Sequence, residues 1–533
     1  MKRIYSFIFI FIFLIGSFLR LYKLDQIPPS LNWDEVAASY NAFTIKNWAK
    51  DEWGKTLPLV FTSFRDDKRP VHIYITSMVF NFLGVSDFSA RFSSALLGIL
   101  LISLFFFLGK LYFGSDLAGL FSAFAIAFSS YDIHYSRGLW EAHFALFFFV
   151  LGLVLFKASL SKKGREVLLP FSYFSFGVSL LSYHSALIVV PPIVLLLTSV
   201  FIRDLFKLFR WFAIGFFVFL VFISILFFEP RLLGIARINQ NKLSSEVVAK
   251  TYLFQKTGSG LLGQLEYNSI KYKDYFYYKY LFSDYSKTPT AAMGYGGLFS
   301  KTVFFMAIMG VFFLILSGKI SLLLILLFWF LLAPVPAAFT GGDAHATRAI
   351  FMLGSPEILA GYGFYYLSRL LKRNFLQLLF LLIIFFLILF EVAPQFYRYF
   401  RNYPKDKAIQ WQYGMKDIVE FVTNNPKYRK VYVDNIRQQP YIFFLWYERV
   451  PLPEFLRTVK YDESGASSFN TVFSFDRYQF GGWDWVESAP LDSVLYVVEP
   501  YKYVGLRYKK DFNFVKLIRY PSGAEAFYMV SSY

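Results

Sequence analysis

Long runs of apolar residues, separated by short polar loops, dominate the first 393 residues of the chain. A helix needs about 20 apolar residues to cross a bilayer, and the pattern predicts about eleven spans. They lie near residues 4–22, 88–109, 115–131, 142–158, 167–183, 185–202, 211–228, 299–316, 320–339, 349–368 and 375–393. The apolar stretch 71–84 is too short to span and is expected to be an interfacial or re-entrant helix. We therefore expect an all-α polytopic membrane bundle.

Basic residues predict how these spans are oriented. If 71–84 does not cross, the compact basic loops near 162–165, 203–210 and 369–373 fall on the same side as the N-terminus. Short loops rich in Lys and Arg favour the cytoplasmic side. The first outer loop (23–87), the long outer loop (229–298) and the C-terminal region should then face outward from the cytoplasmic (plasma) membrane.

Residues 394–533 contain no long apolar runs, which predicts a separate soluble domain after the membrane module 1–393. The stretch 415–422 has a helical period, 430–433 and 493–498 resemble strands, and 440–446 is apolar and ambiguous. A small C-terminal α/β domain is the expected result.

The composition of the chain excludes several classes of ligand and metal site. The net charge of +18 does not indicate nucleic acid here, because the basic residues sit in loops between spans and suit anionic lipid. The chain has no cysteine, which excludes disulfides and thiolate metal sites. The carboxylates and histidines have no spacing that names an ion, so we expect no defined cofactor and leave a divalent cation open.

The first outer loop carries an unusual acidic pair, Asp34-Glu35, after Asn32-Trp33. Asn32 can cap a helix whose third residue is Glu35, as a capping box requires. Glu35 thus has a structural task, whereas Asp34 has none and is the candidate catalytic acid. The helix is expected to be amphipathic and to lie on the membrane surface. The alternative is that both acids only complement the helix dipole.

Other polar residues collect at the predicted outer ends of the spans. Lys68 and Arg69 precede Pro70 and could clamp a phosphate, or could simply snorkel to lipid. Arg137 and Glu141 are four residues apart and are expected to share a helix face, either as a site pair or as an ordinary surface pair. The remaining candidates are His345 and Arg348, expected where the tenth span starts, and the supporting pair Tyr183-His184.

A reaction that suits such an outer rim is glycosyl transfer from a lipid-phosphate sugar. Cations would hold the donor phosphate and stabilise the charge that develops as it leaves. A carboxylate would accept the proton of the acceptor, and one displacement would invert the anomeric carbon. The chain contains no phosphate-cradling nucleotide loop, which agrees with a donor that needs no ATP.

The order of several short motifs resembles a known family. They are Pro28-Pro29 after a span, Asp34-Glu35, Lys68-Arg69-Pro70, Gly84 and Arg91-Phe-Ser-Ser-Ala. This pattern is similar to the C-type integral-membrane glycosyltransferases, and more narrowly to the family 39 and aminoarabinose-transferase-like group that includes the protein O-mannosyltransferases. The resemblance is strongest over 1–160, weaker to 393, and leaves the C-terminal domain uncovered.

The resemblance implies a membrane glycosyltransferase with a polyprenyl-phosphate sugar donor, a glycan, lipid or protein acceptor, and an outward-facing site. It implies catalytic roles for Asp34 and Glu141, although the family commonly has Asp where this chain has Glu141. It implies a donor-phosphate contact for Lys68, shared with Arg69, makes Glu35 the neighbour of the first acid, and matches Arg137 to a basic residue four positions before the second. From their positions at the outer ends of spans, we also expect donor-phosphate contacts for Arg137, His345 and Arg348. Tyr183 and His184 are expected to have a supporting role, with a purely structural one as the alternative. The alternatives are a flippase or transporter of lipid-linked glycans, a polymerase or ligase of surface glycans, and a non-catalytic membrane scaffold.

Overall fold

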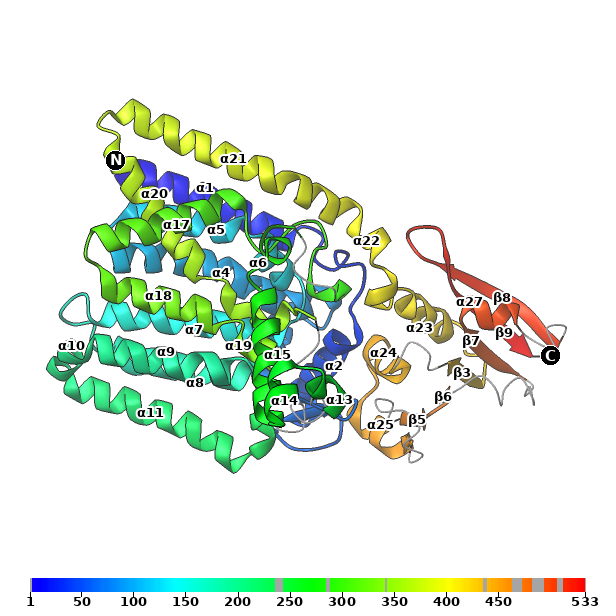
Figure 1. The fold of residues 1–533 in the computed structure, drawn as a ribbon. Helices are drawn as coiled ribbons and strands as arrows, with labels where there is room; N and C mark the ends of the chain where they lie inside the picture. The colour runs from blue at the N-terminus through cyan, green and yellow to red at the C-terminus, as the bar shows by residue number, and fades with distance from the viewer. Residues whose placement is uncertain are drawn as a thin grey trace. The chain divides into compact units, whose positions relative to one another are not determined.

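The computed structural model describes residues 2–234, 243–283, 288–340, 343–434, 439–462, 472–481, 493–505 and 511–532. The chain forms two compact units, shown in Figure 1. The bundle unit comprises Met1–Tyr22 and Ser94–Tyr399, and the sheet unit comprises Lys23–Ser93 and Phe400–Tyr533. Neither unit is continuous in sequence, because the first loop belongs with the C-terminal part of the chain.

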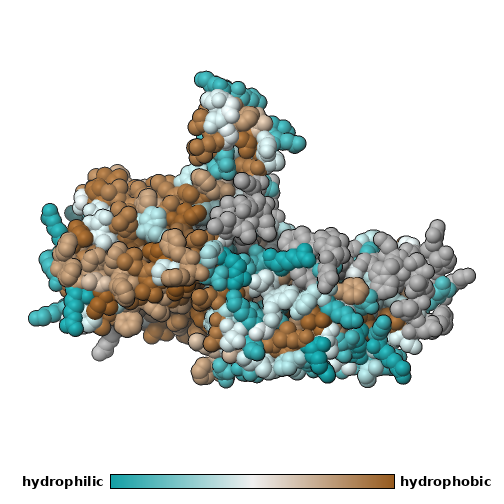
Figure 2. Space-filling view, turned by 90° about the horizontal axis from the view of Figure 1, so that it is seen from below, coloured by the Kyte–Doolittle hydropathy of each residue, from teal (hydrophilic) through white to brown (hydrophobic). Residues whose placement is uncertain are grey.

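Helices occupy the positions at which the sequence predicts spans. They are α1 (Lys2–Leu21), α4 (Asp87–Phe113), α5 (Asp116–Ala127), α7 (Glu141–Ser159), α8 (Leu168–Ser182), α9 (Ala186–Val200), α11 (Phe209–Phe228), α17 (Lys301–Leu316), α18 (Ile320–Leu332), α20 (Ser355–Leu370) and α21 (Asn374–Arg401). Within the described residues, six helical segments are long and apolar enough to cross a membrane, and α5, α8, α9 and α17 are shorter apolar helices. Hydrophobic side chains cover the flank of the bundle in Figure 2. The protein is therefore a multi-pass helical membrane protein.

The third predicted span ends earlier than expected. Helix α5 stops at Ala127, and a separate short helix, α6 (Ser130–Ser136), follows it. The Ser129 side chain accepts a hydrogen bond from the Asp132 N–H and caps this new helix. A polar residue that can cap a helix competes with continuation of the previous one, which the apolar pattern alone does not reveal.

The tenth predicted span begins later than expected. A 3-10 segment, η3 (Thr347–Met352), precedes α20, which starts at Ser355. Gly354 has a φ of 117°, and its N–H donates to Glu357 Oε2 at 2.7 Å. This glycine turn and cap set the start of α20, six residues after the position predicted from hydrophobicity.

Small residues let α20 approach two neighbouring helices closely. An added Cβ at Gly363 would come within 2.1 Å of the Met306 carbonyl oxygen of α17, and one at Gly361 within 2.2 Å of Ser122 Oγ of α5. Membrane helices commonly pack through such small residues, because backbones can then meet directly. Helices α5, α17 and α20 consequently lie side by side in Figure 1.

A buried polar network joins α1, α4, α6 and α7 inside the bundle. Arg20 of α1 is fully buried and pairs with Asp132 of α6. Asp132 Oδ1 lies 3.2 Å from His143 Nε2, and His143 Nδ1 lies 3.0 Å from Ser94 Oγ. Since unpaired charge is costly inside a membrane protein, each member depends on the others. The hydrophobic pattern of the sequence does not reveal this network.

The long loop 229–298 is largely helical where it is described; residues 235–242 and 284–287 lie outside the described part. Its elements are η1 (Pro230–Leu233), α13 (Ser245–Ala249), α14 (Tyr252–Thr257), α15 (Gly260–Asp274), α16 (Tyr278–Phe282) and η2 (Pro289–Ala291). The remaining short helices of the bundle unit are α10 (Ile202–Lys207) and α19 (Val335–Ala338).

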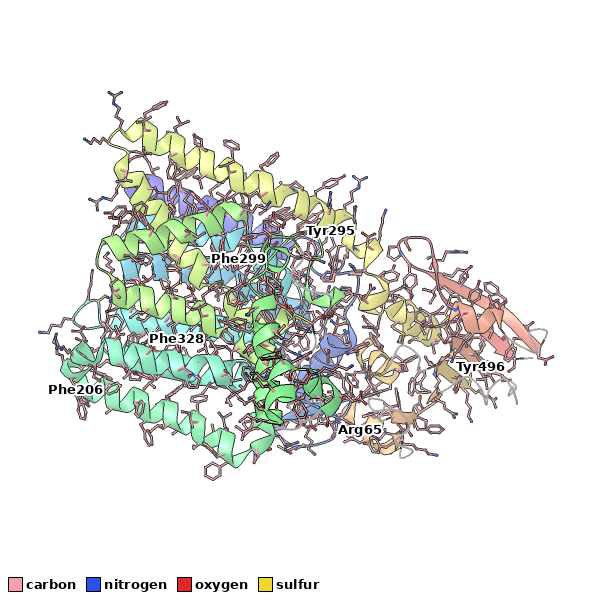
Figure 3. All side chains as sticks on the ribbon, viewed as in Figure 1. Arg65, Phe206, Tyr295, Phe299, Phe328 and Tyr496 are labelled. Carbon is pink, nitrogen blue, oxygen red and sulfur yellow. The ribbon has the colours of Figure 1, made fainter. Side chains whose placement is uncertain are left out.

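A mixed seven-stranded sheet forms the centre of the sheet unit, with strand order β4-β5-β6-β3-β7-β9-β8. Its strands are β3 (Lys430–Asp434), β4 (Lys460–Tyr461), β5 (Val472–Phe475), β6 (Tyr478–Gly481), β7 (Val494–Val498), β8 (Phe512–Arg519) and β9 (Glu525–Ser532). Strand β3 pairs in parallel with β6 and β7, whereas the other pairs are antiparallel. Tyr432, Tyr496 and Phe512 pack in its core, and Figure 3 marks Tyr496. The C-terminal part of the chain thus has the expected helices and sheet, and it forms one compact unit with Lys23–Ser93.

The helices of the C-terminal part include one that the sequence pattern predicts and one in a stretch whose structure the pattern left ambiguous. They are α22 (Tyr403–Asp406), η4 (Ile409–Trp411), α23 (Met415–Thr423), α24 (Pro440–Tyr447), α25 (Leu452–Thr458) and α27 (Pro500–Val504). The helical period expected at 415–422 is α23, and the ambiguous stretch 440–446 is helical rather than extended. Residues 435–438 and 482–492, which follow two parallel strands, lie outside the described part.

The first loop contributes α2 (Trp33–Trp48), β1 (Phe61–Ser63), β2 (Asp66–Lys68) and α3 (Pro70–Leu83) to the sheet unit. Helix α2 packs against α3 and α24, and Tyr40 Oη donates to the Val450 carbonyl at 3.0 Å. Ten of its 16 residues are buried. The prediction of an amphipathic surface helix is wrong, because the C-terminal part of the chain covers faces that sequence periodicity assigned to lipid or water.

Candidate active site

Asp34 is held in the first turn of α2 by the predicted capping box. The Asn32 side chain accepts from the Glu35 N–H at 3.0 Å, and Glu35 Oε2 accepts from the Asn32 N–H at 3.1 Å. This reciprocal pair satisfies two backbone donors that a helix start otherwise leaves open. It also leaves the neighbouring Asp34 side chain outside the cap, with 43% of its surface exposed.

Asp34 meets Lys68, which lies 34 positions further along the chain. Lys68 Nζ lies 2.7 Å from Asp34 Oδ1 and 2.9 Å from Asp66 Oδ2. The indole N–H of Trp33 donates to Asp34 Oδ2 at 3.1 Å. The carboxylate is thus half-exposed and oriented through both oxygens, and a lysine that is only 15% exposed supplies its counter-charge.

A two-stranded hairpin positions Lys68. Strands β1 and β2 pair antiparallel, with Phe61 opposite Lys68 and Ser63 opposite Asp66. Lys68 ends β2, and Arg69 is the N-cap of α3, with Pro70 in its first turn. Arg69 is 1% exposed. Of the two expected phosphate cations in this loop, Lys68 has the more accessible charge.

His72, one turn into α3, adds no positive charge to this group. It is buried, and burial together with the nearby Lys68 ammonium lowers its pKa to about 3. The imidazole is therefore neutral at physiological pH. A neutral ring beside Lys68 can donate or accept a hydrogen bond without competing for an anion.

Glu35 has a second partner that sequence reasoning missed. Arg91 is fully buried, and its guanidinium binds Glu35 through two contacts, Nε to Oε1 and Nη2 to Oε2, each 3.0 Å. The same guanidinium donates to the Leu24 carbonyl at 3.1 Å and to the Pro28 carbonyl at 2.8 Å. Arg91 thus ties α2 to the segment that leads into it. A lone arginine near the start of a long apolar helix was the available signal.

Residues of the C-terminal part support the start of α2. The Trp33 N–H donates to Gln412 Oε1 at 3.2 Å, and Ser30 Oγ donates to the Trp411 carbonyl. The Arg91 guanidinium lies 5.5 Å from the centre of the Trp411 ring. The sequence analysis assigned no task to this segment, which here helps to fix the turn that carries the candidate acid.

Glu52 is a buried carboxyl that contacts the same hairpin. Ser63 Oγ donates to Glu52 Oε1 at 2.6 Å, and the Glu52 N–H donates to Asn41 Oδ1 at 2.9 Å. Glu52 Oε2 is buried without a hydrogen-bond partner. Burial raises the pKa of Glu52 from its ordinary value of 4.5 to about 8, so the group is protonated at neutral pH.

We expect Glu52→Gln to flatten the pH dependence of stability. The pKa of Glu52 is about 8 in the folded state and 4.5, its ordinary value, in the unfolded state. The free energy of unfolding of the wild type should therefore fall as the pH rises from 4.5 to about 8. The slope is at most about 1.4 kcal/mol per pH unit. The variant should therefore gain stability relative to the wild type as pH rises, in thermal unfolding at several pH values. The exposed Glu454→Gln serves as control, and parallel wild-type and Glu52→Gln curves would refute the assignment.

Within the bundle unit, Arg137 has a structural environment. It is fully buried at the end of α6, and its guanidinium donates to the carbonyls of Leu19 at 2.9 Å and Tyr22 at 2.7 Å. Carbonyl groups at the end of a helix lack intrahelical donors, and Arg137 satisfies two of them at the end of α1.

The expected shared helix face of Arg137 and Glu141 is wrong. Helix α6 ends at Ser136, and Glu141 is the first residue of α7. Gly138 lies in the turn between them, where an added Cβ would come within 2.3 Å of the Trp140 indole nitrogen. Four-residue spacing therefore does not place the two side chains on one helix. Glu141 is partly exposed at the start of α7.

The other bundle candidates lie at the starts of later segments. Ser185 Oγ, next to Tyr183-His184, donates to the Arg348 carbonyl at 2.6 Å, so these two stretches meet. The His345 N–H donates to Tyr275 Oη at 3.0 Å, and Arg348 Nη1 donates to Thr340 Oγ1 at 2.9 Å. His345 precedes the 3-10 segment η3 and Arg348 lies within it, so the predicted position at an α-helix N-terminus is wrong.

Part of the chain that carries these side chains matches a known protein family in sequence. Residues 67–228 match the family described as dolichyl-phosphate-mannose-protein mannosyltransferase. The match includes Lys68, Arg69, Arg91, Arg137, Glu141 and His184, and begins after Asp34. No curated protein matches the chain in sequence.

Several solved structures share the fold across most of the chain. ArnT from Cupriavidus metallidurans in the apo state is 14% identical, with a TM-score of 0.56, over 99% of this chain and 98% of that one. The same enzyme bound to undecaprenyl phosphate is 13% identical, with a TM-score of 0.55, over 98% and 97%.

A third similar structure is the archaeal oligosaccharyltransferase AglB from Archaeoglobus fulgidus, in complex with an inhibitory peptide and a dolichol-phosphate. It is 14% identical, with a TM-score of 0.51, over 85% of this chain. The chain spans 64% of the length of that protein. At such low identities the likeness establishes the fold. The chain has the fold that these solved glycosyltransferase structures share, and its residues 67–228 match the mannosyltransferase family in sequence, in agreement with the resemblance that the motifs indicated.

Proposed function

We propose that the protein transfers a sugar from a polyprenyl-phosphate donor to an acceptor at the outer face of the cytoplasmic membrane. The observation that carries this proposal is the pairing of Asp34 with Lys68 at 2.7 Å, on a loop that is only partly buried. A base and a phosphate-binding cation are the two groups that such a transfer needs from the protein. The family matched by residues 67–228 uses a lipid-phosphate sugar, by its description.

The pairing supports a sequence of events in which binding of the donor frees Asp34, the base, from its ion pair with Lys68. In the free protein the Lys68 ammonium is shared between Asp34 and Asp66. The donor phosphate is a diester with one negative charge, and it gains a second charge as the sugar leaves, so it would draw the ammonium toward itself as the reaction proceeds. Asp34 then loses its counter-charge, which makes it a better proton acceptor when the donor is in place.

The chemical step is a single displacement at the anomeric carbon. The acceptor oxygen or nitrogen forms a bond to that carbon, while the bond between the carbon and the phosphate oxygen breaks with its electron pair. Asp34 takes the acceptor's proton, and polyprenyl phosphate leaves with its charge held by Lys68. One displacement inverts the configuration of the transferred sugar.

The topology that suits this reaction has eleven spans, with the N-terminus and the basic loops in the cytoplasm. The helices at the predicted positions support it, including the shorter α5, α8, α9 and α17. The sheet unit, which carries Asp34 and Lys68, then faces outward. Accessibility of single cysteines introduced into this cysteine-free chain tests the orientation: Arg65→Cys should react with a membrane-impermeant reagent in intact cells, whereas Lys163→Cys should not.

We also propose roles in sugar or acceptor binding for Glu141, Tyr183 and His184, and in phosphate binding for Arg69, Arg137, His345 and Arg348. Those of Glu141, Arg69 and Arg137 rest on the resemblance, and the others on the predicted positions of these residues at the outer ends of spans. The buried setting of Arg137 favours a structural task for that residue. A divalent cation also stays untested: we propose that Lys68 meets the donor phosphate directly, so that EDTA leaves the rate unchanged. Loss of activity that Mg²⁺ or Mn²⁺ restores would assign a metal instead.

The purified protein in lipid nanodiscs, incubated with a panel of polyprenyl-phosphate sugars and candidate acceptors, tests the proposal. We expect release of polyprenyl phosphate with at least one donor, together with an acceptor product of inverted configuration. Movement of intact donor across the bilayer without release would instead identify a flippase. Formation of long glycan chains would identify a polymerase.

A further inference from the structure

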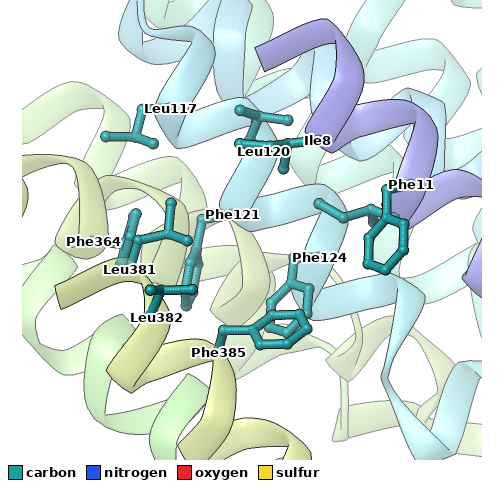
Figure 4. Close-up of a pocket in the computed structure, with 11 residues that line it drawn as sticks. Ile8, Phe11, Leu117, Leu120, Phe121, Phe124, Phe364, Leu381, Leu382 and Phe385 are labelled. Carbon is teal, nitrogen blue, oxygen red and sulfur yellow. The ribbon is translucent and has the colours of Figure 1, made fainter. Parts of the chain in front are cut away.

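An apolar slot opens in the flank of the bundle unit between α1, α5, α20 and α21 (Figure 4). Its volume is about 250 Å³, and the eleven residues that line it are all Leu, Ile or Phe. Phe121 and Phe364 stack at 4.5 Å, and Phe124 and Phe385 lie 5.2 Å apart. Leu382, at the rim, is 41% exposed. The slot is thus a firm-walled apolar recess that an outside molecule can enter.

The four helices contribute to the slot from the same end of the bundle. Ile8 and Phe11 belong to the first half of α1, Leu382 to the first half of α21, and Phe364 to the second half of α20. Figure 1 shows the N-terminus of the chain beside the connection between α20 and α21. The slot therefore draws on the halves of α1, α20 and α21 that lie nearer to this connection.

Positive charge gathers at this end. Arg369 lies in the last turn of α20, and the exposed Lys372 and Arg373 precede α21. Residues 369–373 contain no acid. The acid at the start of α5, Asp116, is already paired with Lys110 at 2.6 Å. The end of the slot thus carries a net positive charge at a membrane surface.

We propose that the slot binds one acyl chain of an anionic phospholipid, whose phosphate lies at the basic connection 369–373. Apolar recesses of this kind take apolar ligands rather than water. A volume of 250 Å³ is smaller than the roughly 300–1,000 Å³ of pockets for drug-sized molecules, so it suits part of one chain. Basic residues beside a groove between spans favour an anionic headgroup. The proposal does not depend on the transfer reaction.

Native mass spectrometry of the delipidated full chain in detergent tests this proposal. Equal amounts of phosphatidylglycerol and phosphatidylcholine with identical chains are added, and undecaprenyl phosphate is added in a separate arm. We expect phosphatidylglycerol to be retained about tenfold better than phosphatidylcholine, because each nearby basic residue strengthens binding of an anionic lipid severalfold.

Two pairs of variants locate the bound lipid. Leu382→Trp should fill the slot and abolish the retained phosphatidylglycerol, whereas Leu387→Trp, on an exposed position of the same helix outside the slot, should not. Replacing Lys372 and Arg373 by Gln should lower retention about tenfold. The same change at Lys162 and Lys163, in another exposed basic connection, should leave it unchanged.

Each other outcome overturns the proposal. Equal retention of the two phospholipids would remove the role of the basic connection. Retention unchanged by Leu382→Trp would place the lipid elsewhere. Displacement of phosphatidylglycerol by equimolar undecaprenyl phosphate, with the same sensitivity to Leu382→Trp, would assign the slot to a polyprenyl chain.

Discussion

Replacing Asp34 by Asn is expected to lower the rate of sugar transfer by about 10²–10⁴-fold. The amide cannot take a proton from the acceptor, although it keeps the size and much of the hydrogen bonding of the carboxylate. The Trp33 indole N–H can still donate to the amide oxygen, so the first turn of α2 should persist. The measurement is the rate of polyprenyl phosphate release by the purified variant at saturating donor.

A matched control separates catalysis from general loss of charge. Asp116→Asn also removes an aspartate that is paired with a lysine, at 2.6 Å, but at the start of α5 in the bundle unit. Its transfer rate should stay within a few-fold of the wild type. Equal rates for Asp34→Asn and the wild type would show that another group accepts the proton.

Glu35→Gln is expected to destabilise the folded protein by about 3–5 kcal/mol. Arg91 is fully buried and binds both Glu35 oxygens, so the change leaves a buried guanidinium without its counter-charge. The capping box is weakened in the same step, because Glu35 also accepts from the Asn32 N–H. Thermal or denaturant unfolding of the purified variant measures the loss.

The double variant Glu35→Gln with Arg91→Met tests the cause. Removing both partners avoids the uncompensated charge, so the double variant should recover part of the stability that the single variant loses. Glu420→Gln, an exposed glutamate of α23, should be neutral. If Arg91→Met lowers the free energy of unfolding by the same amount in the wild type and in the Glu35→Gln variant, the two residues act independently, which would contradict the proposed cause.

Local features of the candidate site could be predicted from sequence, because they depend on neighbouring residues. The capping box needs only Asn32 and Glu35, three positions apart, and both of its hydrogen bonds are present. The span positions follow from hydrophobic runs of sufficient length. The pairing of Asp34 with Lys68 is not local: the sequence indicated that both belong to one outer site, but not that they contact each other.

Contacts between distant parts of the chain could not be predicted in this way. Arg91 meets Glu35 across 56 positions, and Gln412 meets Trp33 across 379. Periodicity describes which face of α2 is apolar but not which later segment covers it. The packing of α24 on that helix therefore turned an expected surface helix into a buried one.

The error at Arg137 and Glu141 has a specific physical origin. Spacing by four residues indicates a shared face only when one helix contains both positions. The turn at Gly138 ends one helix before the next begins, so Arg137 and Glu141 belong to different elements. A single glycine in an apolar context was the signal that the helix could end there.

Binding of undecaprenyl phosphate to the purified wild type and to two variants tests the central claim, that Lys68 serves the donor phosphate and Asp34 in turn. Lys68→Gln should bind the lipid phosphate at least about tenfold more weakly. Asp34→Asn should bind it as tightly as the wild type or more tightly, because Lys68 no longer has to leave a carboxylate. Undiminished binding by Lys68→Gln, or binding lost in Asp34→Asn while the variant remains folded, would contradict the account.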